Sequence, residues 1–367
     1  MKTLRVGLDA HMVGGQETGN ETYVKGLVGA LSADVTGLDL VVYFVGSPWA
    51  SPNRHLRFKR LLTGNPYVRL GLELPIRSFG GIDILHMTYG APVWSAALIV
   101  LTVHDICYAT NPEWFSQHDL RVLSNVVPRS IKKAAHVITD SQSARRQIID
   151  HYQVPENKIS AIPIGPGAGA QPITMEDARL EAAALGLSPD RPYMLAVGNV
   201  QPRKNLVRLI EAFTELVSVR GHDLDLVIVG PQRFRAEDIV RSSGQVSERV
   251  RFTGYVTDRQ LAACYRCSSV FVLPSLYEGF GLPALEAMAH GVPTACSNAG
   301  ALPEICGEAA IMFDPLSVEA IVEAVNRILT DSALRERLRL AGPARAQEFS
   351  WQRTAELTFE AYKKAIA

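Results

Sequence analysis

The sequence predicts an α/β protein built from two Rossmann-like domains. Apolar runs typical of buried parallel strands alternate with helical patterns in two consecutive series, over residues 4–165 and from residue 193 onward. Residues 165–173 separate the series, with four Gly or Pro among their first five positions, as is typical of an interdomain linker. The 367 residues suffice for two full-sized cores. We expect two domains that face each other across a cleft.

The first series opens with a strand, a glycine-rich loop and a helix, expected at 4–10, 14–20 and 21–32. In such a unit the loop amides and the helix N-terminus can face a phosphate, although glycines that only form a turn fit as well. The spacing does not match G-x-G-x-x-G, so it does not indicate NAD binding. The remaining strands of this series are expected at 40–46, 82–89, 98–106, 136–141 and 158–165.

Helices connect these strands in both series. Ser141 or Ser143 can cap a helix that is expected to run to residue 152. In the second series a strand at 193–198 precedes a helix at 206–219, which Asn205 could cap. Further strands are expected at 225–230, 249–256, 268–275 and 292–296, followed by a helical tail from 317 to the end of the chain.

The composition is that of a soluble globular protein, with 47% apolar and 20% charged residues. The formal net charge is zero, so nothing draws the whole chain to nucleic acid, and no nucleic-acid partner is expected. No apolar run approaches the roughly 20 residues that cross a bilayer, and the start lacks signal-peptide features, so we expect a cytoplasmic protein. The five cysteines suit a reducing compartment. Cys264 and Cys267 fit small buried cysteines better than a metal or redox pair.

Residues 51–78 form a basic stretch with interleaved apolar residues. Six cations, Arg54, Arg57, Lys59, Arg60, Arg69 and Arg77, accompany a single acidic residue, Glu73. Such a stretch could be a solvated loop and helix face, or it could contact an anionic membrane surface or a lipid-linked acceptor. In the second case the protein would be peripheral at the inner membrane face.

Arg203 and Lys204 come directly before the helix expected at 206–219. Cations at a helix N-terminus oppose the macrodipole, each by about 0.3–1 kcal/mol. Two adjacent cations there indicate an anion in the same site, such as a diphosphate, unless they are simply a tolerated solvated pair. If they serve a ligand, Lys204→Ala should lower turnover with little unfolding.

Glu278 and Glu286 lie in a strand–turn–helix segment at 268–290. Glu278 falls in the glycine-rich turn, at the strand's carboxyl end where open α/β sheets bind ligands, and Glu286 falls in the helix that Pro283 can open. Eight residues of continuous helix would separate them by roughly 12 Å, whereas a glycosidase pair needs about 5–9.5 Å. We therefore interpret the two glutamates as residues that bind two different parts of one long ligand. Glu286 could accept hydrogen bonds from ribose, and Glu278 could hold a sugar.

The chain resembles a known family. The run PSLYEGFGLPALEAMAHGVPT at 274–294 resembles the E-x7-E signature of glycosyltransferase family 4, and the similarity covers most of residues 192–316. In the first half, TVHDICYATNPEWF resembles the family's histidine–aspartate loop, in a form similar to mannosyl- and rhamnosyl-type bacterial members. The resemblance implies the GT-B fold. It assigns residues 1–168 and a returning helix at 350–367 to an acceptor-side domain, and residues 169–349 to a nucleotide-sugar domain.

The resemblance also implies an activity, a retaining transfer of a hexose, with mannose favoured. The donor would be a nucleotide diphosphate sugar, the acceptor a glycan or lipid-linked hydroxyl, and no metal or other cofactor would be required. Arg203 and Lys204 would neutralise the leaving diphosphate, and His104 would lie beside the sugar near the acceptor. The remaining implied roles are donor binding by Gly15, Tyr255 and Val256, ribose binding by Glu286, and sugar binding by Glu278, Gly279, Phe280, Gly281 and Leu282.

Two segments depart from the family pattern. GGQETGN at 14–20 lacks the frequent glycine-x-glycine-arginine form, which leaves acceptor-side roles there open, and IPIGPGAG at 162–169 replaces the usual asparagine–glycine–valine linker. Two other functions also stay open, a nucleotide-sugar epimerase or hydrolase on the same fold and a catalytically silent GT-B binding partner.

Overall fold

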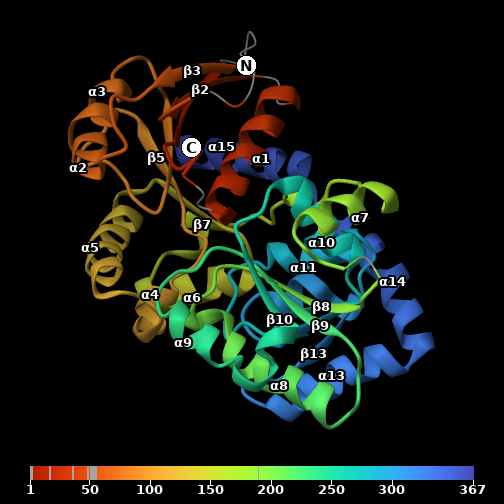
Figure 1. Ribbon diagram of the computed structural model, residues 1–367. Helices are drawn as coiled ribbons and strands as arrows, with labels where there is room; N and C mark the ends of the chain where they lie inside the picture. The colour runs from red at the N-terminus through yellow and green to blue at the C-terminus, as the bar shows by residue number, and fades with distance from the viewer. Residues whose placement is uncertain (1–2, 16–17, 35–36, 48, 50–55, 189) are drawn as a thin grey trace. The chain divides into compact units, whose positions relative to one another are not determined.

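The computed structural model describes residues 3–15, 18–34, 37–47, 49, 56–188 and 190–367 (Figure 1). The chain divides into two units. Unit 1 comprises Met1–Pro112, Gln117–Gly165 and Ser350–Ala367, and unit 2 comprises Glu113–Ser116 and Pro166–Phe349. The division after Gly165 falls inside the predicted linker, three residues before the expected boundary at 168.

A seven-stranded parallel sheet forms the centre of unit 1, in the order β3-β2-β1-β4-β5-β6-β7. The order reverses between β1 and β4, which makes the carboxyl ends of these strands the expected ligand edge. β4 is buried along its whole length, as is typical of a parallel strand covered on both faces. The strands are β1 (Leu4–Ala10), β2 (Leu38–Phe44), β3 (Leu56–Arg60), β4 (Ile84–Thr88), β5 (Leu98–Thr102), β6 (His136–Thr139) and β7 (Ile159–Ala161).

The helices of unit 1 connect these strands. Ser141 caps α6 through a hydrogen bond from the backbone N–H of Ala144, so the predicted serine cap is confirmed at the first of its two positions. The helices are α1 (Thr18–Asp34), α2 (Pro66–Val68), α3 (Leu74–Ser78), α4 (Cys107–Thr110), α5 (Gln117–Lys133), α6 (Gln142–Tyr152) and α15 (Trp351–Ile366), with a wider helical turn at Arg69–Glu73 joining α2 to α3.

The C-terminal helix α15 is part of unit 1. A Cβ atom on Gly26 of α1 would overlap the indole of Trp351, and one on Gly165 would lie 2.6 Å from its Cδ1 atom. At the other end of the helix the hydroxyl of the buried Tyr362 lies 2.6 Å from Nδ1 of His86 on β4. The two glycines thus let the helix pack closely on the unit.

A six-stranded parallel sheet forms the centre of unit 2, in the order β10-β9-β8-β11-β12-β13. This order also reverses once, between β8 and β11. The strands are β8 (Tyr193–Val197), β9 (Asp225–Val229), β10 (Val250–Gly254), β11 (Val270–Leu273), β12 (Thr294–Ser297) and β13 (Ala310–Phe313).

Amphipathic helices close the core of unit 2. On α8, apolar residues at a spacing of three and four, including Leu206, Leu209, Ile210 and Phe213, are buried against the sheet. The helices are α7 (Met175–Ala184), α8 (Leu206–Ser218), α9 (Ala236–Arg241), α10 (Asp258–Cys267), α11 (Leu282–Ala289), α12 (Leu302–Cys306), α13 (Val318–Thr330) and α14 (Ser332–Ala346).

Both sheets contain a strand that the sequence did not predict. β3 lies in the basic stretch at 51–78, which had been expected to form a loop or helix face, and Arg54 of that stretch lies outside the described residues. β13 is a four-residue edge strand. The predicted helical tail is three helices, α13, α14 and α15. In the described part of the chain, no helix has the length and apolar character needed to span a membrane.

Candidate active site

The predicted cation pair and Glu278 meet at the centre of unit 2. Arg203 and Lys204 occupy a short 3-10 turn, Pro202–Lys204, after β8, and Glu278 follows β11. β8 and β11 are neighbours in the sheet, and the strand order reverses between them. The three side chains therefore lie at the ligand edge of an open α/β sheet.

Glu278 accepts hydrogen bonds from both cations. Nζ of Lys204 lies 2.6 Å from Oε1 of Glu278, and a guanidinium nitrogen of Arg203 lies 3.0 Å from Oε2. The hydroxyl of Ser275 donates to Oε1 at 2.5 Å. The cluster is largely buried, with side-chain exposures of 17%, 10% and 8% for Arg203, Lys204 and Glu278. The alternative that Lys204 is simply a tolerated, solvated cation is therefore wrong, because the residue is part of a buried network.

The charges in this cluster decide the protonation of Glu278. Burial alone would raise the pKa of Glu278, but the charges of Lys204 and Arg203, together with hydrogen bonds from Lys204 and Ser275, outweigh burial and lower the pKa to about 2. The carboxylate is ionised at neutral pH, and the cluster of two cations and one anion carries a net positive charge. A net positive, buried cluster is suited to binding an anionic ligand group.

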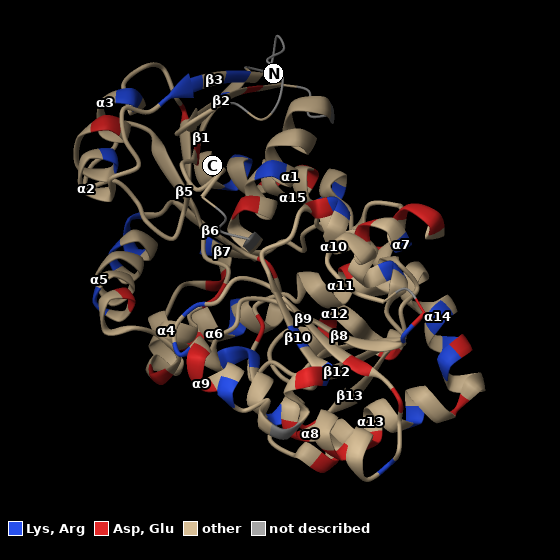
Figure 2. Ribbon diagram, in the orientation of Figure 1, with Lys and Arg blue, Asp and Glu red and all other residues tan. Residues whose placement is uncertain are grey.

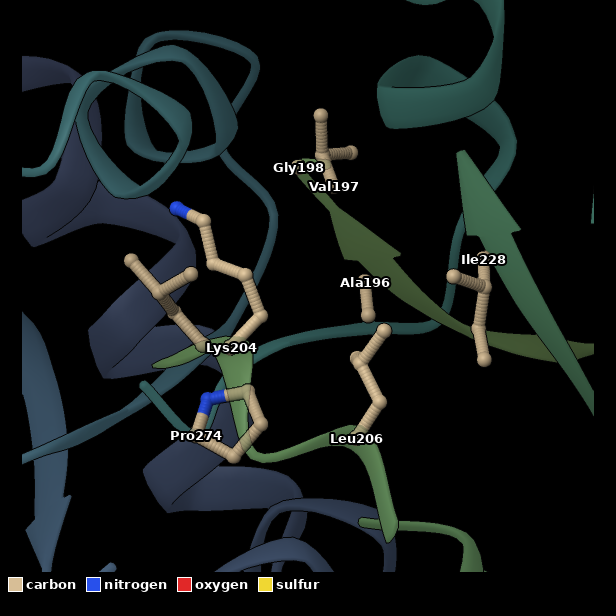
Figure 3. Close-up of a pocket in the computed structure, with 8 residues that line it drawn as sticks. Ala196, Val197, Gly198, Lys204, Leu206, Ile228 and Pro274 are labelled. Atoms are coloured by element: carbon tan, nitrogen blue, oxygen red, sulfur yellow. The ribbon is translucent and has the colours of Figure 1, made fainter. Parts of the chain in front are cut away.

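One glycine shapes the path of the Lys204 side chain. Gly198, at the end of β8, has φ 147°, and a Cβ there would lie 2.9 Å from Cε of Lys204. Figure 3 shows Lys204 extending away from Leu206 toward this end of the strand. A cavity of about 10 Å³ beside it, lined by Ala196, Leu206 and Ile228 among others, is large enough for about one water. Substrate binding would therefore need space outside this small cavity.

The glycine-rich turn after Glu278 depends on close backbone packing. Gly300 has φ 61°, and a Cβ there would overlap the carbonyl oxygen of Glu278, which accepts a 2.9 Å hydrogen bond from the backbone N–H of Ala301. Gly281, with φ 111°, occupies the N-cap position of α11 beside Leu302. Larger residues at either glycine would displace the turn that carries Glu278.

Asn205 has a different role from the predicted one. Its φ of 55° is left-handed, and its side chain makes no capping hydrogen bond to α8. The amide nitrogen instead donates to the carbonyls of Pro274, at 3.0 Å, and Pro315, at 2.7 Å. The amide oxygen, which would have to accept the capping hydrogen bond, accepts one from the guanidinium of Arg208 at 2.9 Å. Asn205 therefore occupies the N-cap position without capping α8, and its side chain ties the loop after β8 to the loops after β11 and β13.

Glu286 lies in α11, as predicted, but its side chain is buried. The hydroxyl of Tyr265 donates to Oε2 of Glu286 at 2.9 Å, and the backbone N–H of Gly169 also donates to the carboxylate. Burial and the charge of Asp258 raise the pKa of Glu286 to about 7, despite these two hydrogen bonds. Glu278 and Glu286 therefore differ in charge state near neutral pH.

The segment that carries Gly169 is held to α11 at a second point. Nε2 of His290 lies 2.7 Å from the carbonyl oxygen of Gly169, and the His290 ring stacks on Tyr265 at 5.9 Å. A Cβ on Gly169 would lie 2.9 Å from Oε2 of Glu286, so the close approach requires glycine. The start of unit 2 thus contacts Glu286, the residue expected to bind ribose.

The remaining donor-side predictions fall on the surrounding loops. Tyr255 and Val256 follow β10, where Tyr255 is 52% exposed and Val256 is buried. Phe280 is buried against Phe349, with ring centroids 5.8 Å apart, so only its backbone remains for a ligand. Gly279 lies in the turn before α11, and Leu282 is the first residue of that helix.

In unit 1, His104 forms a buried pair that the sequence did not predict. Nδ1 of His104, after β5, lies 2.6 Å from Oδ2 of Asp140, after β6. Nε2 of His104 and the second oxygen of Asp140 are buried without a polar partner among the described residues. Burial alone would lower the pKa of His104, but the charge and hydrogen bond of Asp140 raise it. The rings of Tyr23 and Tyr89 pack edge-on against the imidazole.

Gly15 lies in the turn after β1, where its N–H donates to the carbonyl of Met12 at 3.1 Å. Residues 16 and 17 of the GGQETGN loop lie outside the described residues. The structure therefore gathers Arg203, Lys204 and Glu278 into one cluster and places Glu286 in a second environment of unit 2. Gly15 and His104 lie at strand ends of unit 1.

Sequence reasoning missed four residues of these sites, Asp140, Gly169, Tyr265 and Ser275. A signal existed for Asp140 and Ser275, because each is a polar residue within two positions of the end of a buried strand. No local signal marked Tyr265, since its position in α10 reads as part of an apolar helix face. Gly169 stood in the predicted linker, where glycine is expected for conformational reasons alone.

Comparison with known proteins identifies the family. The model described as "Glycosyl transferases group 1" matches residues 177–345, and the model described as "Glycosyltransferase Family 4" matches residues 18–165. O-antigen chain mannosyltransferase B of Escherichia coli is 32% identical over 267 residues, which cover 72% of this chain and 70% of that protein. The serotype-specific mannosyltransferase WbdA of Escherichia coli is 30% identical over 272 residues, 73% of this chain but only 33% of its own length.

Solved structures show the same fold. A sucrose-phosphate synthase from Thermosynechococcus elongatus aligns with a TM-score of 0.76 and 25% identity over 99% of both chains. HepE of Anabaena, in complex with UDP-glucose, aligns with a TM-score of 0.74 and 19% identity over 98% of this chain and 99% of its own. The protein belongs to glycosyltransferase family 4, and its two Rossmann-like units have the GT-B fold. It is a glycosyltransferase.

None of the five cysteines forms a disulfide in this structure. Burial raises the pKa of the Cys264 thiol to about 12. Cys267 is only partly buried. Such a thiol at position 264 is unreactive at neutral pH, which favours a packing role over a redox role. Among the described residues no cluster of three His, Cys, Asp or Glu side chains is arranged to hold a metal.

Proposed function

We propose that the protein transfers a hexose, with mannose favoured, from a nucleotide diphosphate sugar to a hydroxyl of a glycan or lipid-linked acceptor, with retention of anomeric configuration. The observation that carries the proposal is the buried Arg203–Lys204–Glu278 cluster at the strand-order reversal of unit 2. The names of the relatives support a mannosyl donor, and the UDP-glucose complex of HepE supports a nucleotide sugar.

In this proposal Arg203 and Lys204 stabilise the leaving diphosphate. The bond from the sugar's anomeric carbon to the diphosphate breaks, and its electron pair stays on the phosphate oxygen. The acceptor oxygen forms its bond to the same face of that carbon, and the acceptor proton passes to the departing phosphate oxygen. Positive charge fixed where negative charge develops is usually the largest catalytic contribution. The cations fill this role without a metal, so we expect activity in the presence of EDTA.

Glu278 has two tasks in this proposal. It holds both cations, and it offers a hydrogen-bond acceptor to the sugar. A carboxylate has about four lone-pair sites, and the bonds from Arg203, Lys204 and Ser275 use three of them. One site is left for a sugar hydroxyl.

Glu286 accepts the ribose hydroxyls in this proposal, with Tyr265 orienting its carboxylate. On the acceptor side, Asp140 orients His104 so that Nε2 can contact the sugar or acceptor. His104 and Glu286 belong to different units and act on different groups, Glu286 on the ribose and His104 on the sugar or the acceptor.

A panel of GDP-, UDP-, ADP- and dTDP-sugars tests the donor. A bound nucleotide sugar stabilises the fold by about 2.7 kcal/mol at a hundred times its dissociation constant, which a thermal shift can detect. Product analysis with and without a mannose oligosaccharide then tests the reaction. Glycosidic product formed only with acceptor, with the donor's anomeric configuration by NMR, supports retaining transfer. Free sugar or an epimerised donor formed at the same rate without acceptor would favour the hydrolase or epimerase.

A further inference from the structure

The segment at residues 66–79 of unit 1 exposes apolar side chains and buries charged ones. Tyr67, Leu72, Ile76 and Phe79 are 85%, 57%, 56% and 69% exposed. A helical segment of a water-soluble protein normally has the opposite arrangement. The reversed pattern indicates that the outer face of this segment contacts an apolar phase or partner.

The charged residues of the segment are held inside the unit. Arg69 is 5% exposed and forms an ion pair with Asp9 at the end of β1, and Glu73 is 6% exposed and accepts hydrogen bonds from the backbone N–H of Leu62. Arg77 donates to Glu73 at 2.8 Å. These bonds fix the orientation of the helical segment, so the apolar face cannot turn inward without breaking them.

Neighbouring loops extend the apolar face. The rings of Phe79 and Trp94 lie 5.5 Å apart, and the backbone N–H of Val93 donates to the carbonyl of Leu70 at 2.9 Å. Leu62, which donates to Glu73, is 86% exposed, Val93 is 64% exposed and Trp94 is 44% exposed. We call this surface the 62–94 face; its apolar members are Leu62, Tyr67, Leu72, Ile76, Phe79, Val93 and Trp94.

Cations border the 62–94 face. Figure 2 shows the edge strand β3 coloured largely as Lys and Arg, and its Arg57, Lys59 and Arg60 are exposed. A side-chain nitrogen of Arg77 donates to the carbonyl of Arg60 at 2.9 Å. Lys133, at the end of α5, reaches the carbonyl of Val93. Neither Lys59 nor Arg60 has an acidic partner in the described part of the chain. The border is therefore positively charged.

We infer that the 62–94 face inserts shallowly into the interface of a bilayer that contains anionic phospholipids. Surfaces that contact the membrane interface typically combine exposed Tyr and Trp with aliphatic side chains and are bordered by Lys and Arg. Each cation near an anionic surface contributes about 1 kcal/mol. The same positive border would also fit a protein surface with an acidic rim. The test below therefore includes a second copy of the chain on this face as an alternative outcome. The inference deepens the proposed function, since a lipid-linked acceptor would be reached at this surface.

Vesicle co-sedimentation of the full chain tests the inference. We expect binding to vesicles of phosphatidylcholine with phosphatidylglycerol, weaker binding to phosphatidylcholine alone, and weakening by salt. The double variant Tyr67→Ser/Phe79→Ser should lose about tenfold or more in vesicle affinity. The matched control is Val219→Ser/Leu340→Ser, which removes two apolar side chains of 74% and 62% exposure in unit 2 and should bind like the parent. Lys59→Glu/Arg60→Glu should lose about tenfold and most of the salt dependence.

Three results would overturn the inference. These are absence of parent binding to anionic vesicles, equal binding by the parent and Tyr67→Ser/Phe79→Ser, and a dimer in solution that this variant abolishes. A thermal unfolding midpoint equal to the parent's shows that a variant is folded. Transfer to a soluble oligosaccharide without vesicles separates the two proposals, because the surface variants should keep this activity. Vesicle binding without any transfer would refute the proposed function and leave the membrane surface standing.

Discussion

The hydroxyl of Tyr265 lies 2.9 Å from the carboxylate of Glu286, in an environment that raises the pKa of that carboxyl to about 7. Ribose hydroxyls that donate hydrogen bonds to Glu286 favour its ionised form and would lower this pKa. The proposed ribose-binding role of Glu286 therefore predicts that donor binding is coupled to release of a proton.

Nucleotide affinity should therefore depend on pH. It should rise as the pH increases toward about 7, where free Glu286 ionises, and level off above it. Calorimetry in buffers of different ionisation enthalpy should detect proton release below pH 7. Glu286→Gln should bind more weakly and remove the pH dependence. An unchanged pH profile in this variant would contradict the ribose role.

Asp140→Asn should separate the charge of His104 from its position. Asparagine keeps a hydrogen-bond partner near Nδ1 but removes the negative charge, so burial should lower the pKa of His104. NMR of the imidazole should show that lower pKa, and turnover should fall by about 10- to 100-fold. Asp150→Asn, at an exposed position on α6, is the matched control. A parent-like imidazole titration in Asp140→Asn would rule out this dependence.

Lys204 illustrates what the sequence could and could not predict. Its place between a strand end and a helix was visible, and so was a need for a neighbouring anion. The predicted anion was a ligand such as a diphosphate. The pairing of Lys204 with Glu278 was not visible, because 74 residues separate the two and only the pairing of β8 with β11 brings them together. The buried apolar strands were predictable for the opposite reason, since their signal is local.

β3 escaped prediction because it lies at the sheet edge. It pairs with β2 alone and alternates exposed basic residues with more buried apolar ones, so its five residues resemble a charged loop. The exposed apolar face at 66–79 could not be predicted in detail, because the sequence showed only apolar residues interleaved with cations. Which residues face outward depends on the wider turn at Arg69–Glu73 and on the inward pairs of Arg69 and Glu73.

The burial of Lys204 changes the expected outcome of removing it. Little unfolding was expected for an exposed cation, but loss of one partner from a buried pair typically costs about 3–5 kcal/mol, and Arg203 and Ser275 should keep the cost near the lower end. Lys204→Met should destabilise unit 2, whereas Lys204→Met combined with Glu278→Gln should cost less than the two single changes together. Urea unfolding of the four proteins in a double-mutant cycle measures this coupling. Additive losses would show that the pair is not coupled.

Gly300→Ala should disturb the active site from outside it. A left-handed residue other than glycine costs about 1 kcal/mol, and overlap with the carbonyl of Glu278 should add about 1–3 kcal/mol. Gly254→Ala is the matched control, since its φ of 73° carries the same strain with no atom within 4 Å of the added Cβ. Urea midpoints and turnover should fall further for Gly300→Ala. Equal losses in both variants would leave only backbone strain as the cause.

The packing of α15 against Gly26 and Gly165 has a consequence for biosynthesis. Most of unit 1 precedes unit 2 in the chain, yet Trp351 and Tyr362, which complete the interior of unit 1, are translated after unit 2. Domains usually fold in the order of their synthesis. Unit 2 is fully translated before unit 1 has its helix α15, so unit 1 begins before unit 2 but completes its fold after it. A chain that stops short of residue 351 leaves exposed the surface of Gly26 and Gly165 on which Trp351 packs.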